Sequence, residues 1–235
     1  MDPKNELKRK AAYRAVDFVE SGMAVGLGTG STAAFALERI AELLRSGQLK
    51  DVVGIPSSVR TGKQARALGI PLVTFDNHPE IDLTIDGADE VDPDLNLIKG
   101  SGGALLREKI LAQCSRREII VVDESKLSPV LGTKSPLPVE VIPFGWQPQA
   151  NYLESLGSRV TVRTTRNGER FKTDQGNMIQ DCTFSRISEP AKLADRLSRR
   201  AGIVEHGLFI GLVSDVIVAG KQGIRHQRYQ EDTEA

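Results

Sequence analysis

Apolar residues in the first half of the chain alternate between two spacings. Stretches in which they recur every three or four residues are typical of helices, and short apolar runs bounded by glycine or polar residues are typical of buried strands. The pattern predicts helices over residues 7–19, 30–44, 58–68 and 103–114, and strands over residues 23–27, 52–55, 72–75, 81–85 and 119–122. This alternation predicts an α/β fold with a mostly parallel, doubly wound (Rossmann-like) sheet, which binds ligands at the carboxyl ends of its strands.

The pattern changes after Pro129. It predicts strands over residues 136–143, 159–163, 177–182 and 203–210, a helix over residues 147–156, and a helix capped by Ser188. Residues 136–143 alternate like a strand with one exposed face. The order β-α-β-β-α-β is that of a ferredoxin-like α+β domain. Residues 215–219 predict a strand that returns to the first sheet. We therefore expect an α/β catalytic domain, residues 1–130 plus 211–235, with a smaller domain, residues 131–210, inserted into it.

The composition limits which partners the protein can bind and in which cellular compartment it can be expected. Thirty-one basic residues balance thirty-one acidic ones, whereas binding to nucleic acid usually needs a basic excess. Two cysteines are too few for a disulfide framework, and no apolar run approaches the ~20 residues that span a bilayer. We expect a cytoplasmic protein without nucleic-acid or membrane partners. The polar residues 222–235 predict a frayed tail.

A glycine-rich loop follows the strand predicted over residues 23–27, with the sequence Gly26-Leu27-Gly28-Thr29-Gly30-Ser31-Thr32. Glycines let backbone N–H groups approach an anion, and the N-terminus of the next helix attracts phosphate. Because Ser31 stands where a dinucleotide fingerprint needs glycine, and because no Gly-Lys-Ser/Thr follows, neither nucleotide motif is present. A tight turn capped by Ser31 explains the same residues, so both interpretations stay open.

Carboxylates crowd the turn after the strand predicted over residues 81–85, in the sequence Asp86-Gly87-Ala88-Asp89-Glu90-Val91-Asp92. Their mutual repulsion can keep one of them protonated and useful as an acid. A calcium loop starting at Asp92 is excluded, because Leu97 takes the required glycine position and Gly103 the required glutamate position. A solvated acidic turn is the structural alternative.

A second glycine-rich turn opens the helix over residues 103–114, with the sequence Lys99-Gly100-Ser101-Gly102-Gly103. It offers a cation and free N–H groups to an anion. Glu108 borders the apolar side of this helix, where partial desolvation would raise the basicity of its carboxylate. The alternative, which composition alone favours, is an exposed Glu108 paired with a neighbouring basic residue. Lys126, shortly after another strand, is placed to reach the same crevice.

Other kinds of chemistry lack their motifs. The three histidines have no H-E-x-x-H spacing, two isolated cysteines cannot build a zinc site, and no G-x-S-x-G elbow is present. The remaining carboxylates, lysines and glycine loops form a metal-free set suited to moving protons on an anionic substrate.

Four segments together resemble, in order and spacing, the motifs of ribose-5-phosphate isomerase type A. They are residues 28–32, 86–90, 99–102 with 107–110, and 125–126, and residues 136–143 also resemble the family's entry into its small domain. The resemblance extends from about residue 6 to residue 219. Two departures are Ser101, where glycine is common in the family, and a tail after Gly220 that looks longer.

The resemblance implies interconversion of D-ribose 5-phosphate and D-ribulose 5-phosphate in the non-oxidative pentose phosphate pathway, without metal or organic cofactor. By similarity, Glu108 takes the proton from C2 of the open-chain aldose and returns it at C1 of the enediolate. Asp86 assists ring opening and proton movement between oxygens. Asp89 and Lys99 line the reacting end, where Lys99 can offset the developing negative charge.

The same resemblance implies the substrate contacts and the assembly. The implied substrate-binding residues are Thr29, Gly30, Ser31, Thr32, Asp86, Gly87, Ala88, Asp89, Lys99, Gly100, Ser101, Gly102 and Lys126. Residues 29–32 would lie near the phosphate, and family members are homodimers or dimers of dimers.

Two other functions share parts of this pattern. An amino-sugar-phosphate deaminase would share the loops but use its own acid and base groups, and a histidine in the catalytic region would favour it. None lies between His78 and His206. A non-catalytic sugar-phosphate sensor would carry DNA-binding helices, and we expect none here, since only a few residues precede the first predicted helix.

Overall fold

The computed structural model describes residues 3–229, and these divide into two compact units. Within the described residues, the first unit contains residues 3–87, Leu111–Ser125 and 212–229. The second unit contains Ala88–Ile110 and Lys126–Gly211. The division into domains at residues 131–210 stays a prediction, because compactness does not test which segment folds independently.

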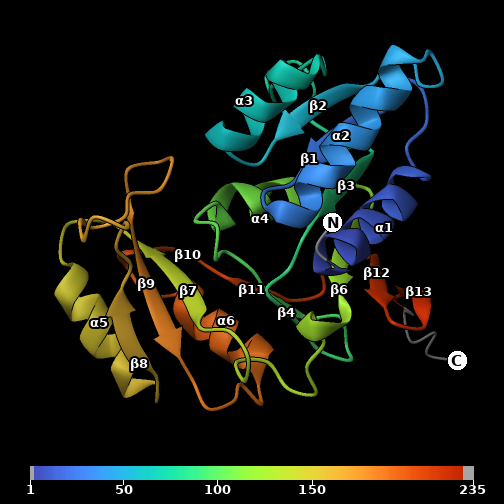
Figure 1. The fold of residues 1–235 in the computed structure, drawn as a ribbon. Helices are drawn as coiled ribbons and strands as arrows, with labels where there is room; N and C mark the ends of the chain where they lie inside the picture. Colours follow the sequence, from blue (N-terminus) through green and yellow to red (C-terminus); the bar gives the residue numbers. More distant parts are fainter. Residues whose placement is uncertain (1–2, 230–235) are drawn as a thin grey trace, which may run out of the picture. The chain divides into compact units, whose positions relative to one another are not determined.

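The first unit is built on a six-stranded sheet in the order β13-β12-β6-β3-β1-β2 (Figure 1). Its strands are β1 (Ala24–Leu27), β2 (Val53–Pro56), β3 (Leu83–Asp86), β6 (Glu118–Asp123), β12 (Asp215–Gly220) and β13 (Gly223–Arg228). All neighbouring pairs are parallel except β12 with β13. The predicted mostly parallel α/β sheet is therefore confirmed, as is the return of residues 215–219 to it.

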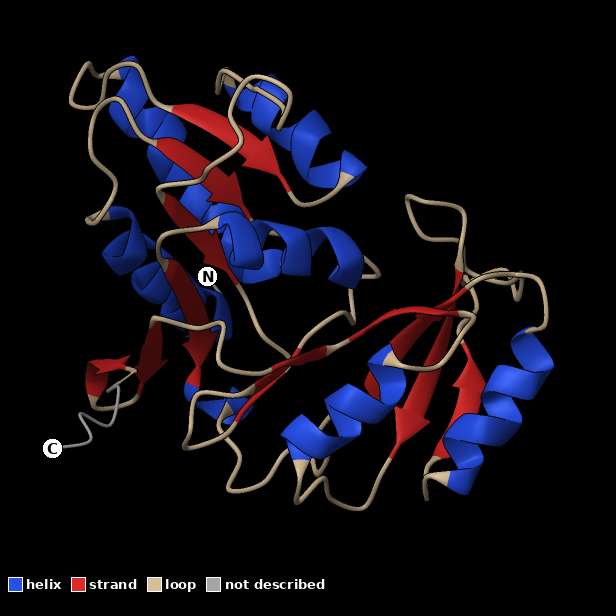
Figure 2. Cartoon of the chain, turned by 180° about the vertical axis from the view of Figure 1, so that it is seen from behind, coloured by secondary structure: helices blue, strands red, loops and turns tan. Residues whose placement is uncertain are grey.

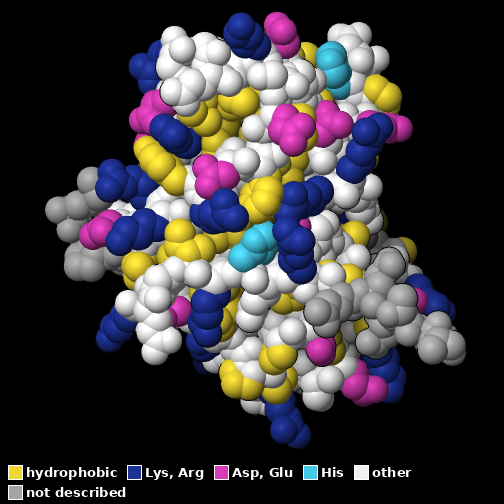
Figure 3. Space-filling view, turned by 90° about the vertical axis from the view of Figure 1, so that its right-hand side faces the viewer, with side chains coloured by type: hydrophobic (Ala, Val, Ile, Leu, Met, Phe, Trp, Pro, Cys, Tyr) yellow, Lys and Arg dark blue, Asp and Glu magenta, His cyan; other side chains and the backbone are white. Residues whose placement is uncertain are grey.

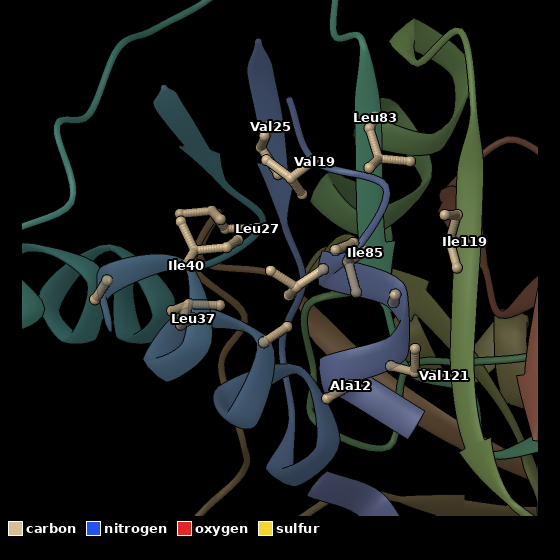
Figure 4. Close-up of a cluster of buried hydrophobic side chains, with 14 of the residues drawn as sticks. Ala12, Val19, Val25, Leu27, Leu37, Ile40, Leu83, Ile85, Ile119 and Val121 are labelled. Carbon is tan, nitrogen blue, oxygen red and sulfur yellow. The ribbon is translucent and has the colours of Figure 1, made fainter. Parts of the chain in front are cut away.

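Helices of the first unit cover this sheet because its strands are apolar on both faces. The helices are α1 (Pro3–Val16), α2 (Ser31–Arg45) and α3 (Val59–Leu68), and α4 (Leu105–Cys114) begins in the second unit and ends in the first. Odd-numbered strand residues point to α1 and α2 and form the main core, as Figure 4 shows for Val25, Leu83 and Ile119. A smaller cluster contains Ile55, Ile81 and Leu111.

Two predictions for the first unit are wrong. Residues 223–228, expected to be frayed, form β13, which pairs antiparallel with β12 through a tight hairpin; residues 230–235 of the predicted tail lie outside the described residues. The polar composition misled the prediction, because β13 is an exposed edge strand. Its arginines disfavour pairing with another edge, and Figure 3 shows basic side chains spread over the side where β13 lies.

The strand predicted over residues 72–75 is absent. Only Leu72 forms a bridge, to Gly54, before the chain turns away.

The second unit contains a four-stranded antiparallel sheet in the order β10-β7-β9-β8. Its elements are β7 (Leu137–Val141), α5 (Trp146–Ser155), β8 (Arg159–Val162), β9 (Met178–Thr183), α6 (Pro190–Ser198) and β10 (Ile203–His206). The predicted β-α-β-β-α-β order is confirmed. Both helices lie on the same side of the sheet (Figure 2), and apolar residues of the sheet and of both helices form one core.

Three details of the second unit differ from prediction. All five residues of β7 are buried, although its alternation predicts one exposed face, because the side chain of Glu140 is covered by Thr173 and Asn177. The helix α6 has Glu189 and not Ser188 at its N-cap. The strand predicted over residues 203–210 is interrupted at Gly207, after which β11 (Leu208–Phe209) leaves the four-stranded sheet.

A three-stranded sheet, in the order β11-β5-β4, completes the second unit. Its strands β4 (Glu90–Val91) and β5 (Leu97–Ile98) are too short to show any periodicity in the sequence. This sheet packs residues 88–98 into the same unit as the ferredoxin-like elements.

Candidate functional site

Strand order in the first unit reverses between β1 and β3. In this sheet β2 lies on one side of β1, and β3, β6 and β12 lie on the other. After β2 the chain therefore returns across β1 to form β3. Ligands of parallel sheets bind at the carboxyl ends of the strands beside such a point. Gly28 directly follows β1 and Asp86 is the last residue of β3, and a Cβ atom added to Gly28 would lie 2.3 Å from Oδ1 of Asp86. Only glycine allows this approach.

The carboxylate of Asp86 is held by the backbone of both loops. Its Oδ1 accepts a hydrogen bond from the N–H of Thr29 at 3.1 Å and one from the N–H of Gly87 at 2.7 Å. The residue is almost completely buried, with 1% of its surface exposed. The structure thus brings together the glycine loop and the first of the predicted acidic residues.

The side chain of Thr29 belongs to a buried group of four hydroxyls, which we call the Thr29 cluster. Its Oγ1 lies 2.8 Å from Oγ of Ser57, 2.8 Å from Oγ of Ser58 and 2.9 Å from Oγ1 of Thr61. Thr61 also donates to the carbonyl oxygen of Gly28 at 3.1 Å. The hydroxyl of Thr29 is therefore engaged inside the protein. Sequence reasoning missed the three partners, which lie just after β2 and in α3.

The helix α2 begins where the glycine loop ends. Gly30 is its N-cap with φ 133°, a conformation that favours glycine, and no side chain caps the helix. Ser31 and Thr32 therefore present N–H groups at the positive end of the helix dipole. Lys8 adds a charge here, because its Nζ donates to Oγ of Ser31 at 2.9 Å. Sequence reasoning missed Lys8, whose position on α1 gives no signal of this contact.

Lys99 and Glu108 form a buried pair in the second unit. The Nζ of Lys99 lies 3.8 Å from Oε2 of Glu108, and the two residues expose 2% and 4% of their surface. Lys99 directly follows β5, and Glu108 lies in the first turn of α4. The exposed, surface-paired Glu108 that composition favours is wrong. A carboxylate enclosed beside an ammonium can exchange a proton in a site with little water.

Asp89 and the second glycine turn lie next to each other in the same unit. The carboxylate of Asp89 accepts a hydrogen bond from the backbone N–H of Ser101 at 2.9 Å and one from its hydroxyl at 2.5 Å. The turn is tied down by Arg163, which donates to the carbonyl oxygens of Gly100 and Ser101 at 2.8 and 3.1 Å. The hydroxyl that distinguishes Ser101 from glycine is thus used to hold Asp89.

The remaining predicted residues are distributed over both units. Gly87 belongs to the first unit and Ala88 to the second, while Gly102 continues the turn of the second unit. Lys126 is the half-buried last residue of a 3₁₀ helix, Glu124–Lys126, that follows β6. The neighbouring Glu90 has a structural role, because its buried carboxylate accepts hydrogen bonds from the backbone of residues 132–135.

The described residues show neither a metal cluster nor a membrane helix. Within residues 3–229, no three His, Cys, Asp or Glu side chains are grouped so that they could hold a metal ion. No helix in the same range is both long enough and apolar enough to cross a membrane.

Fold and site together define an α/β protein in which the N-terminus of α2 has no side-chain cap and a lysine–glutamate pair is buried. Comparisons with known proteins show which family has this fold and this sequence. A sequence model of the family described as Ribose 5-phosphate isomerase A (phosphoriboisomerase A) matches residues 53–223. Ribose-5-phosphate isomerase A of Desulfatibacillum aliphaticivorans is 58% identical over 97% of this chain and 99% of its own. That of Chloroflexus aurantiacus is 57% identical over 93% and 92%.

Solved structures give the same result. Ribose 5-phosphate isomerase from Plasmodium falciparum superposes with a TM-score of 0.93 and 43% identity, over 97% of this chain and 100% of the other. A D-ribose-5-phosphate isomerase in complex with phospho-erythronic acid has a TM-score of 0.93 and 39% identity, over 95% and 98% of the two chains. The chain belongs to the ribose 5-phosphate isomerase A family.

Proposed function

We infer that this chain is an aldose–ketose isomerase that interconverts D-ribose 5-phosphate and D-ribulose 5-phosphate in the pentose phosphate pathway. The observation that carries the inference is the buried pair of Lys99 and Glu108, 3.8 Å apart, in a chain that is 58% identical to a ribose-5-phosphate isomerase A. This isomerisation moves one proton between adjacent carbons, so it needs a base and a cation that offsets the charge of the enediolate.

Glu108 is the base. Its carboxylate takes the proton from C2 of the open-chain aldose, the C1 carbonyl accepts the electron pair, and a cis-enediolate forms. The same carboxyl group then returns the proton to C1, which gives the ketose. Burial at 4% exposure removes water that would compete for the proton and strengthens every charge interaction in the site.

Lys99 stabilises the negative charge that develops on the enediolate oxygens. A cation that is already in place pays no reorganisation cost at the moment of reaction. Asp86 assists ring opening and proton movement between O1 and O2, and its fixed hydrogen bonds to Thr29 and Gly87 keep its orientation. Asp89, held by Ser101, lines the reacting end with Lys99.

The glycine loop and α2 bind the phosphate. Ser31 and Thr32 offer helix N-terminal N–H groups, Lys8 adds a charge beside Ser31, and Lys126 completes the substrate contacts. Thr29 supports this loop from inside the protein, because its N–H donates to Asp86 and its hydroxyl bonds within the Thr29 cluster. Charge-assisted contacts to phosphate are worth roughly 1.5–3 kcal/mol each, so the phosphate supplies much of the binding energy. The residues proposed here need no metal or organic cofactor.

Assembly and location complete the proposal. The protein forms homodimers or dimers of dimers in the cytoplasm. Sedimentation of the purified protein tests the first statement, and a monomer at working concentration would contradict it. Fractionation of cells that produce the protein tests the second.

The function is tested by incubating pure protein with ribose 5-phosphate and measuring ketose formation. We expect rapid formation of ribulose 5-phosphate and negligible turnover of unphosphorylated ribose, which lacks the phosphate contacts. Binding without ketose formation would indicate a sensor. Release of ammonia from an amino-sugar phosphate, with no ketose from ribose 5-phosphate, would indicate a deaminase.

A further inference from the structure

Residues 205–209, which link β10 to β11, hold the backbone of Lys99. The N–H of Lys99 donates to the carbonyl oxygen of Gly207 at 2.9 Å, and the pairing of β11 with β5 continues this contact up to Lys99. A Cβ atom on Gly207 would lie 2.2 Å from the carbonyl oxygen of Lys99. Glycine at position 207 therefore allows the two chain segments to come this close.

The ring of Phe209 holds the ammonium groups of two lysines. The Nζ atoms of Lys99 and Lys109 lie 5.4 and 5.0 Å from the ring centroid. Phe209 is completely buried, and cation–π attraction is strongest where water is excluded. The ring thus fixes the direction of the Lys99 side chain and takes part in holding α4, which carries Lys109.

Lys109 anchors α4 to the same segment. Its Nζ donates to Oε1 of Glu205 at 2.6 Å and to the carbonyl oxygen of His206 at 2.7 Å. Burial lowers the pKa of Lys109, while the charge of Glu205 opposes this shift. His206 stays neutral, since burial and the charge of Lys109 lower its pKa to about 4. Lys109 directly follows Glu108, so this anchor also fixes the segment of helix that carries the base.

We propose that residues 205–209 are the positioning element of the isomerase: Phe209 holds the ammonium of Lys99, Lys109 bonded to Glu205 holds α4, and together they set the separation of Lys99 and Glu108. The proposal rests on the proposed function, in which these two residues act on the substrate. Phe209 and Lys109 are positioning residues, and neither has to touch the substrate. The Lys99–Glu108 separation is thus controlled by a segment about a hundred positions further along the chain.

The test replaces Phe209 with leucine, which keeps an apolar side chain but removes the ring. We expect kcat to fall roughly 10- to 30-fold, the value of a desolvated cation–π contact, with the KM for ribose 5-phosphate unchanged. Affinity for phospho-erythronic acid, whose carboxylate carries charge at the reacting end, should fall by a similar factor. Affinity for ribitol 5-phosphate, which is neutral at that end, should not change.

Leu197→Val is the matched control, because Leu197 is buried in the core of the same unit. It should lower the melting temperature without changing kcat. A second variant, Lys109→Met, should lower kcat at least tenfold with both analogues still bound, and Lys109→Arg should recover part of the loss.

Unchanged kcat in Phe209→Leu and Lys109→Met would overturn the proposal and leave these residues as core packing. Equal losses of affinity for both analogues would also overturn it, since they indicate a general distortion. These results differ from failure of the proposed function, in which the unmodified protein itself makes no ketose from ribose 5-phosphate.

Discussion

The Thr29 cluster and the Lys99–Glu108 pair solve the problem of burying polar groups in opposite ways. The cluster is neutral, and its hydroxyls satisfy one another and the carbonyl of Gly28. The pair is charged, and its cost of burial is offset by mutual attraction and by the ring of Phe209. In the proposed function, neutral hydroxyls hold the loop whose backbone binds the phosphate, whereas the buried pair supplies the proton acceptor and its counter-charge. The two tasks place different demands on stability.

The two regions also differ in what holds them. The Thr29 cluster joins the ends of two adjacent parallel strands, β1 and β2, and a parallel sheet brings such ends together wherever it forms. The Lys99–Glu108 pair depends on residues 205–209, which reach it through the short pairing of β11 with β5. The charged region should therefore respond more strongly to substitution and to pH.

Lys99→Met should lower turnover strongly. Methionine fills a similar volume without the ammonium, so the enediolate loses its counter-charge, and kcat should fall ~10²–10³-fold. Steady-state kinetics with ribose 5-phosphate checks this. Lys172→Met, at an exposed position of the same unit, is the control and should change little. Retention of most of the turnover in Lys99→Met would remove this residue from the mechanism.

Acid should destabilise the charged region and not the hydroxyl cluster. Burial, followed by the charge of Lys109, lowers the pKa of His206 from 6.5 to about 4. Between these values the unfolded chain binds a proton at His206 that the folded chain does not. The contribution of neutral His206 to the free energy of unfolding is therefore fully present above about pH 6.5 and decreases as the pH falls toward 4. Denaturant melts at several pH values measure this, and His206→Gln should show a smaller decrease than the unmodified protein. An identical pH dependence would contradict the assignment.

Gly28→Ala should disturb the neutral region through sterics alone. The added Cβ would lie 2.6 Å from Cα of Asp86, and the backbone of one loop must shift. We expect a loss of about 1–3 kcal/mol in the free energy of unfolding at every pH. Gly87→Ala is the control for stability, since its Cβ would meet only the carbonyl oxygen of Val121 at 3.9 Å. Equal stability of the two variants would show that the contact between Gly28 and Asp86 is loose.

Thr61→Val should have the smallest effect. It removes the hydroxyl that bonds to Thr29 and to the carbonyl of Gly28, at a cost of roughly 1–2 kcal/mol in unfolding free energy. The KM for ribose 5-phosphate should rise while kcat changes less, because in the proposed function the cluster supports the loop that binds the phosphate and not the proton transfer. A fall in kcat larger than that of Lys99→Met would show that the Thr29 cluster, and not the Lys99–Glu108 pair, limits the proton transfer.

The sequence predicts the neutral region better than the charged one, for a physical reason. The glycine loop and Asp86 stand at the ends of short apolar runs that are buried on both faces, β1 and β3, so their meeting follows from the parallel sheet. In residues 205–209 the only signal of the break between β10 and β11 is Gly207 itself, and a single glycine does not tell a break from a bulge. The burial of Glu108 is marked only weakly in the sequence, because Glu108 borders the apolar side of α4 but has a charged residue on either side of it. Hydroxyls such as Ser57 and Thr61 carry no signal until the fold places them.

Solvent isotope exchange shows whether Glu108 carries the proton between C2 and C1, as the proposed function requires. In D2O, the unmodified protein should form ribulose 5-phosphate with deuterium at C1, because the base exchanges its proton with solvent during some turnovers. Glu108→Gln keeps the shape of the side chain without the basic carboxylate, so both turnover and deuterium incorporation should fall at least ~10²-fold, with phospho-erythronic acid still bound. A Glu108→Gln variant that isomerises and exchanges at close to the normal rate would contradict the account.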